Sequence, residues 1–103
     1  MEKVLANIQW LSADEGGRSV PLQVGEVYYP HISIEEIDNG QPWSIRFPVT
    51  PIREDRNSEI CFSLLADNEE SRAYTARLFM GQKFRLLEGR TTVALGTIKR
   101  IIH

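Results

Sequence analysis

Hydrophobic and polar residues alternate with a period of two along much of the chain, which predicts β-strands. In residues 3–11 the apolar side chains stand at every second position, the spacing of one face of a strand: Val4, Ala6, Ile8 and Trp10. Other segments rich in strand-forming residues are 43–49, 59–66, 83–88 and 92–102. We expect a strand in each, with the last two joined as a hairpin through the turn at residues 88–91.

The segments between these strands carry weaker signals. Residues 20–29 are expected at strand edges or in extended loops, because Pro21 and Pro30 lack a backbone donor. In residues 31–37 the apolar alternation slips once, which predicts a strand with either a bulge or its end at that point. Residues 38–42 (DNGQP) form a strong turn signal.

Residues 67–80 change character and favour a helix. Asp67 and Glu70 have the spacing of a capping box, and Gly81 stands where a helix would end. Ala73, Tyr74 and Leu78 are the side chains expected to pack inward. We therefore expect one short helix near residues 68–79, and the pattern does not say whether this segment binds a partner.

About seven short strands, glycine turns and at most one helix predict an all-β fold, a small antiparallel barrel. An immunoglobulin-like sandwich is the alternative on pattern alone. The chain has 103 residues, of which 42% are hydrophobic and 25% charged, enough for one core. We expect a single domain over residues 1–103.

Composition excludes several classes of function. Apolar runs fall short of the ~18 residues that cross a bilayer, so we expect no membrane partner. The single cysteine, Cys61, forms no internal disulfide, and one Cys with two His is too few ligands for structural zinc. We therefore expect a cytoplasmic protein without a metal or cofactor.

The charge is distributed unevenly. Residues 1–71 hold five basic and thirteen acidic residues, a net charge of −8. Residues 72–103 hold seven basic residues and one acidic residue, Glu88, a net charge of +6. The basic third could form a face for an acidic partner or a phosphate backbone. Alternatively, its charges pair with the acidic part of the chain on a mixed surface.

The turn after the first strand carries a family resemblance. Residues 12–25 read SADEGGRSVPLQVG. This stretch resembles the third, C-terminal domain of bacterial elongation factor Tu, where a strand ends in Lys-Asp-Glu-Gly-Gly-Arg, followed by Pro and, four residues later, Gly. The matching residues are Asp14, Glu15, Gly16, Gly17, Arg18, Pro21 and Gly25.

Residues 84–98 (FRLLEGRTTVALGTI) resemble the closing hairpin of the same domain. The matching residues there are Glu88, Gly89, Thr92, Val93 and Gly96. The chain also departs from the family: the closing turn lacks one of two glycines, so that Arg90 is displaced by one residue, and Ala94 replaces another glycine. Residues 67–80 look like a helical insertion. The resemblance implies a six- or seven-stranded antiparallel β-barrel, and because no G-x-x-x-x-G-K-[ST] phosphate loop is present, it does not extend to GTP binding.

In the family, this domain grips the T-stem of aminoacyl-tRNA and contacts the GTPase domain and the exchange factor. The resemblance implies that Arg18 stands at an RNA-contacting position, Ser19 where the family often has His, and Gly89, followed by Arg90, at a turn glycine that approaches RNA. The alternative is that Gly16 and Gly17 serve turn geometry and Arg18 pairs with Asp14 or Glu15.

Aromatic residues gather at Tyr28, Tyr29 and His31. Such a group could be a hot spot for a partner, or it could form the rim of the core. Trp10 and Trp43 are expected in the core, and Cys61 is expected as a small buried hydrophobe without a nearby base.

No catalytic constellation emerges. Glu35 and Glu36 are adjacent, so in a regular strand they point to opposite faces and cannot cooperate. We expect a non-catalytic binding module whose partner is a protein, with translation components as candidates. Binding of tRNA backbone through Arg18 and the basic third is the alternative, and an enzyme with an unrecognised site is a third class.

Overall fold

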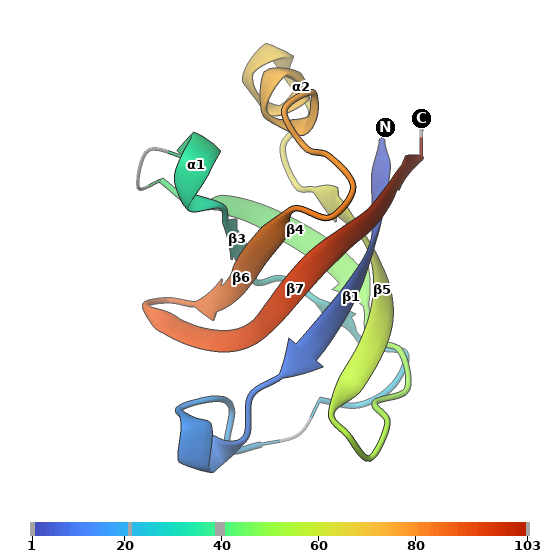
Figure 1. Ribbon diagram of the computed structural model, residues 1–103, viewed down its shortest axis with the longest axis vertical. Helices are drawn as coiled ribbons and strands as arrows, with labels where there is room; N and C mark the ends of the chain where they lie inside the picture. The colour runs from blue at the N-terminus through green and yellow to red at the C-terminus, as the bar shows by residue number, and fades with distance from the viewer. Residues whose placement is uncertain (1, 21, 39–40, 103) are drawn as a thin grey trace.

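The computed structural model describes residues 2–20, 22–38 and 41–102 and shows a mostly β protein (Figure 1). Seven strands in this part of the chain are accompanied by one short helix, a single helical turn and a 3₁₀ turn. The elements in order are β1 Lys3–Trp10, η1 Ala13–Glu15, β2 Val27–Tyr28, β3 His31–Ser33, α1 Glu35–Asp38, β4 Trp43–Pro48, β5 Asn57–Leu64, α2 Glu69–Thr75, β6 Lys83–Glu88 and β7 Thr91–Ile102.

Six of these strands close into an antiparallel barrel. Around the barrel the order is β3, β6, β7, β1, β5 and β4, and β4 pairs with both β5 and β3 to complete the ring. β2 is an additional strand on the outer edge of β4. The predicted barrel is therefore confirmed, and the sandwich alternative is wrong, because the ring of backbone hydrogen bonds leaves no second sheet.

The two ends of the chain run side by side. β1 pairs with β7 over its whole length, from Lys3 opposite Ile102 to Trp10 opposite Ala94 (Figure 1). On its other edge β1 pairs with β5. The strands β3, β4 and β5 are consecutive in the chain and also lie side by side in the barrel. This wiring is a Greek key, in which a long connection brings the first strand beside the last of three neighbours.

The core fills the inside of the barrel with the apolar residues that alternate along the strands. Val4, Ala6, Ile8 and Trp10 are all buried, as the period of two predicts. In the hairpin the register shifts between Leu86 and Leu87, so that both are buried. This irregularity explains why alternation is less regular near the end of the chain.

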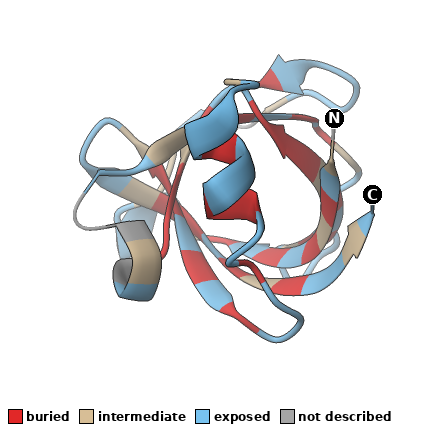
Figure 2. Cartoon of the chain, turned by 90° about the horizontal axis from the view of Figure 1, so that it is seen from above, coloured by how far each residue is buried: buried red, intermediate tan, exposed pale blue. Residues whose placement is uncertain are grey.

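α2 lies across one end of the barrel and covers it (Figure 2). Tyr74 and Leu78 are buried, and the Tyr74 ring packs against Trp43 with 5.3 Å between ring centroids. Trp43 is half-buried, whereas Ala73, which was expected to pack inward, is exposed. The segment whose role the sequence left open therefore closes the core.

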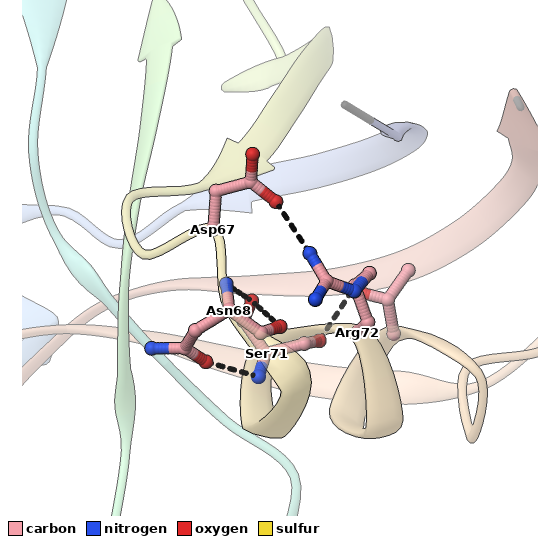
Figure 3. A network of polar contacts seen from close by, with 5 residues as sticks. Asp67, Asn68, Ser71 and Arg72 are labelled. Atoms are coloured by element: carbon pink, nitrogen blue, oxygen red, sulfur yellow. Dashed lines mark hydrogen bonds and ion pairs between the residues drawn. The ribbon is translucent and has the colours of Figure 1, made fainter.

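The start of α2 differs from the prediction by one residue. Asn68 is the N-cap: its side chain accepts a hydrogen bond from the Ser71 amide at 2.8 Å, and the Ser71 hydroxyl accepts one from the Asn68 amide at 2.8 Å (Figure 3). Asp67 pairs with Arg72 at 3.2 Å. The helix also ends at Thr75, several residues before Gly81.

Residues 31–37 are only partly a strand. β3 ends at Ser33, and α1 begins at Glu35, with the Ile37 amide donating to the Ile34 carbonyl at 3.0 Å. The slip in alternation thus marks a helical turn, since residues three apart share a helix face. The expectation that Glu35 and Glu36 occupy opposite faces of a strand is wrong, because both lie in α1.

Cys61 was expected to be a small buried hydrophobe. Cys61 is half-buried and not in the core, because its neighbours Ile60 and Phe62 take the inward positions of β5. The expectations for Pro21 and for the tip of the turn at residues 39–40 lie outside the described residues. No helix in the described ranges is long and apolar enough to cross a membrane.

Candidate binding surface at the barrel end

The turn that follows β1 is held together by hydrogen bonds around the short 3₁₀ helix η1. Ser12 and Glu15 form a capping box around η1: the Glu15 amide donates to the Ser12 hydroxyl at 3.2 Å, and the Ser12 amide donates to the Glu15 carboxylate at 2.9 Å. These bonds to Ser12 hold the pKa of the Glu15 carboxyl below its ordinary value. Glu15 is therefore engaged within the turn and is not the partner of Arg18.

The two glycines of the turn have different roles. Gly16 has φ of +91°, the left-handed region that glycine adopts without strain. Gly17 lies so close to Leu11, the residue that follows β1, that a Cβ on Gly17 would stand 2.3 Å from the Leu11 carbonyl oxygen. Both glycines are thus explained by turn geometry, and together they direct Arg18 back across the end of the barrel.

Arg18 pairs with Glu88, seventy residues away in the chain. Its guanidinium contacts the Glu88 carboxylate, donates from Nε to the Val20 carbonyl at 3.0 Å and lies 5.6 Å from the centroid of the Tyr28 ring. The expected pairing with Asp14 or Glu15 is wrong. Partial burial lowers the pKa of Arg18 and is the largest single effect, but the hydrogen bonds and charge interactions with Glu88 and Tyr28 together outweigh it, so the pKa is raised.

Tyr28 joins Arg18 and Glu88 in a cluster of three side chains and connects it to the core. Its ring is buried against Trp10 and Phe47, at centroid distances of 5.8 Å and 5.6 Å, and its hydroxyl donates to Glu88. Burial raises the pKa of Tyr28 above its ordinary value of 10.0, and the hydrogen bond to Glu88 adds to the shift. Tyr28 therefore links the core to the ion pair at the barrel end.

The aromatic group expected at residues 28–31 divides between core and surface. Tyr28 is buried, whereas the side chain of Tyr29 is 58% exposed. His31 is half-buried in β3, where it pairs with Leu87 of β6 and Ser44 of β4. These three residues therefore do not form a continuous aromatic surface, because Tyr29 is the only one of them that is exposed.

Gly89 and Arg90 form the two-residue turn of the β6–β7 hairpin. Gly89 has φ of +60°, and both residues are exposed. A glycine at the first central position is typical of a tight hairpin turn. The predicted hairpin is confirmed, and it holds Arg90 at the tip, next to the Glu88 that Arg18 contacts.

The two turn motifs, near opposite ends of the sequence, therefore meet at one end of the barrel. Between them is a hollow of about 320 Å³, lined by residues that include Arg18, Ser19, Val20, Glu88 and Thr91. We call residues 17–20 and 88–91 the barrel-end surface. It lies at the end of the barrel away from α2 (Figure 1).

Sequence reasoning identified Arg18, Ser19, Tyr28, Gly89 and Arg90 but missed Glu88 as the residue that connects them. A signal was present, since Glu88 is the one acidic residue among residues 72–103. The mixed-surface interpretation pairs bases of residues 72–103 with acids of residues 1–71. In this ion pair the acid, Glu88, lies in the basic part of the chain and the base, Arg18, lies in the acidic part.

The connection that leaves this surface exposes several apolar side chains. Val20 and Val24 are each 64% exposed, Val27 is 50% exposed, and Tyr29 follows them. These four residues fall within ten positions of the chain. Apolar side chains gathered on one exposed segment are a common mark of a surface that contacts another protein.

The basic residues of the last third lie on several elements. Lys99 pairs with Glu59 at 2.7 Å and Arg72 with Asp67 at 3.2 Å, so these two match the mixed-surface interpretation. Lys83 and Arg85 stand two positions apart on β6, and both are exposed.

No protein-family model matches this chain. The resemblance to elongation factor Tu thus stays a prediction that rests on the two turn motifs, because a small barrel is compatible with many functions. Among the described side chains, no three from His, Cys, Asp and Glu lie together as a metal site would require.

Proposed function

We propose that the protein is a non-catalytic binding module whose partner is another protein. The observation that carries this proposal is the set of exposed apolar side chains that follow the barrel-end surface in the chain: Val20, Val24, Val27 and Tyr29. Exposed apolar side chains that lie together on one surface often mark a site of contact with another protein. Binding would bury them next to Arg90, and Tyr and Arg are residue types that often dominate such contacts.

The anchoring of this surface supports the same function. Arg18 is held by Glu88 and Val20, and Tyr28 joins the pair to the core, so the backbone that presents Val20 and Tyr29 is fixed before any partner arrives. A surface ordered in advance loses less conformational entropy on binding. The cluster is therefore assigned a positioning role, with no chemistry of its own.

The link to translation is part of the proposal. The turn motifs resemble the domain that elongation factor Tu uses to contact its GTPase domain, its exchange factor and tRNA. A barrel with these corners could occupy a surface that the translation factor uses. The single cysteine fits a reducing compartment, and we place the protein in the cytoplasm.

A comparative capture experiment tests the protein partner. The immobilised protein and a Val24→Asp/Tyr29→Ala double variant are incubated with lysate of the source organism, and bound proteins are identified by mass spectrometry. We expect a partner that the wild type retains and the double variant loses. Leu65→Asp, at an exposed apolar residue outside this segment, is the matched control and should retain it.

The proposal fails if no protein distinguishes the double variant from the control. The identity of a retained partner then tests the translation link separately, since a partner outside translation would remove that link alone.

RNA binding through Arg18 is the alternative, and it makes a different prediction. Part of the guanidinium already donates to Glu88 and Val20, so an RNA phosphate would have to compete with these bonds. Titration of a short RNA duplex at low salt should therefore show little binding. Strong, salt-dependent binding that Arg18→Ala abolishes would favour RNA over a protein partner.

A further inference from the structure

A second concave surface lies on the outside of the barrel, away from the ion pair of Arg18. It is a hollow of about 600 Å³ over the outer faces of β5, β1, β7 and β6, strands that run side by side in Figure 1. Glu36 of α1 stands at its edge. This volume is within the range of ligand-binding hollows in proteins.

The lining divides into two kinds of chemistry. On the β6 side, Lys83 and Arg85 are exposed cations on the same face of the strand. On the β1 and β5 side stand three carboxamides, Asn7, Gln9 and Asn57. Each carboxamide can both donate and accept hydrogen bonds, as a peptide group does.

Leu95 of β7 lies between these two sides, with its side chain 45% exposed. The groove therefore offers, in order, positive charge, a small apolar area and a row of paired donors and acceptors. An extended peptide has the matching groups: side-chain carboxylates, aliphatic side chains and a backbone with one donor and one acceptor per residue.

The width of the groove fits a short segment of chain. Four strands spaced by ~4.8 Å span about 14 Å, which about four or five residues of extended peptide would cross at ~3.3 Å each. A segment lying across the strands would place alternate side chains toward the sheet, so carboxylates near β6 could reach Lys83 and Arg85.

Nucleic acid matches this lining less well. Single-stranded nucleic acid binds mainly where exposed aromatic rings stack on its bases. The aromatic residue of the lining, Phe84, is buried, with its ring turned into the barrel against Gly96. The groove thus offers cations without a stacking platform.

We propose that this groove binds an extended acidic segment of a protein, with its carboxylates at Lys83 and Arg85 and its backbone at the carboxamides of β1 and β5. The site is separate from the barrel-end surface and does not depend on it. Glu36 at the edge repels such a segment, so it limits the affinity.

The test uses the full chain, labelled with ¹⁵N, and a blocked heptapeptide, Glu-Ser-Glu-Ser-Leu-Ser-Ser, at low salt, in which the two glutamates and the leucine fall on one face of the extended chain. We expect amide shifts on titration to concentrate at residues 7–9, 83–85 and 95–97, and to leave Arg18 and Tyr29 unchanged. This pattern separates the groove from the barrel-end surface, so either proposal can fail while the other stands.

Variants then test the assigned groups. Lys83→Ala/Arg85→Ala should weaken binding about fivefold, the loss of two exposed ion pairs. Arg77→Ala/Arg100→Ala removes the same charge from exposed positions outside the lining and should change affinity less than twofold. Glu36→Gln should tighten binding about twofold.

The proposal is overturned if the peptide causes no localised shifts, or if both double variants weaken binding equally. It is also overturned if a uridine octamer shifts the same residues at lower concentration than the peptide, which would assign the groove to nucleic acid.

Discussion

At the scale of single residues, the glycines show how much of a sequence motif is local geometry. Gly16 and Gly17 are adjacent, but one supplies a left-handed conformation and the other a close approach of two backbone segments. The sequence predicts a turn from the pair and cannot separate these roles, because the second depends on where Leu11 lies.

The two glycines should therefore differ in what they tolerate. Gly17→Ala should lower the free energy of unfolding by about 3 kcal/mol, since the clash with the Leu11 carbonyl involves backbone that no rotamer change relieves. Gly16→Ala, where nothing lies within 4 Å, should cost about 1 kcal/mol for its positive φ. Urea denaturation measures both, and an equal or larger cost at Gly16 would contradict the assignment.

Tyr28 predicts a dependence of stability on alkaline pH. Its pKa in the folded protein is raised above 10.0, so the unfolded chain ionises first and stability falls as pH rises above that value. One such group contributes at most about 1.4 kcal/mol per pH unit. Tyr28→Phe should lose stability less steeply above pH 10 in urea denaturation, although it is less stable at pH 7 because Glu88 loses a donor. Identical slopes in both proteins would contradict this.

At the scale of elements, the helix shows where sequence patterns lose precision. A capping box was predicted at Asp67 and Glu70, but the structure uses Asn68 and Ser71. Both pairs have suitable side chains at the required spacing, but Ser71 is buried in the folded protein, whereas Glu70 is exposed. The choice between the two pairs is made by packing and lies beyond the local sequence.

Capping variants separate the two registers. Asn68→Ala should lower the free energy of unfolding by about 1 kcal/mol, because the Ser71 amide loses its acceptor. Glu70→Ala should cost only about 0.3 kcal/mol, the effect of a negative charge near a helix start. Thermal unfolding of both variants and of the wild type measures the difference. A larger loss of stability for Glu70→Ala would instead support the capping box predicted at Asp67 and Glu70.

At the scale of the whole molecule, a small antiparallel barrel could be predicted from the sequence, while the order in which its strands pair could not. Alternation marked β1, β4, β5, β6 and β7 to within a few residues, because each presents one face to a single core. The pairing of β1 with β5 and β7, of β3 with β6, and of Arg18 with Glu88 joins residues far apart in sequence. Such contacts leave little local trace, apart from the isolated acid at position 88.

Packing inside the barrel gives a prediction that involves two strands. Gly96 lies opposite Phe84, and a Cβ there would stand 2.1 Å from the Phe84 ring, which is itself buried. Gly96→Ala should therefore cost about 1–3 kcal/mol. In a Phe84→Leu background the same change should cost clearly less, because the ring that causes the clash is absent. Chemical denaturation of the four proteins gives the coupling, and strictly additive costs would contradict it.

The pairing of β1 with β7 has a consequence for how the chain can be rearranged. Partners in an antiparallel pair stand only about 5 Å apart, so a short linker could join residues 3 and 102 without disturbing the barrel. New termini could then be opened in the exposed loop at residues 51–56. Such a circular permutant would keep every strand pairing while reversing the order in which β1 and β5 are synthesised, so its refolding rate would show whether this pairing must form early.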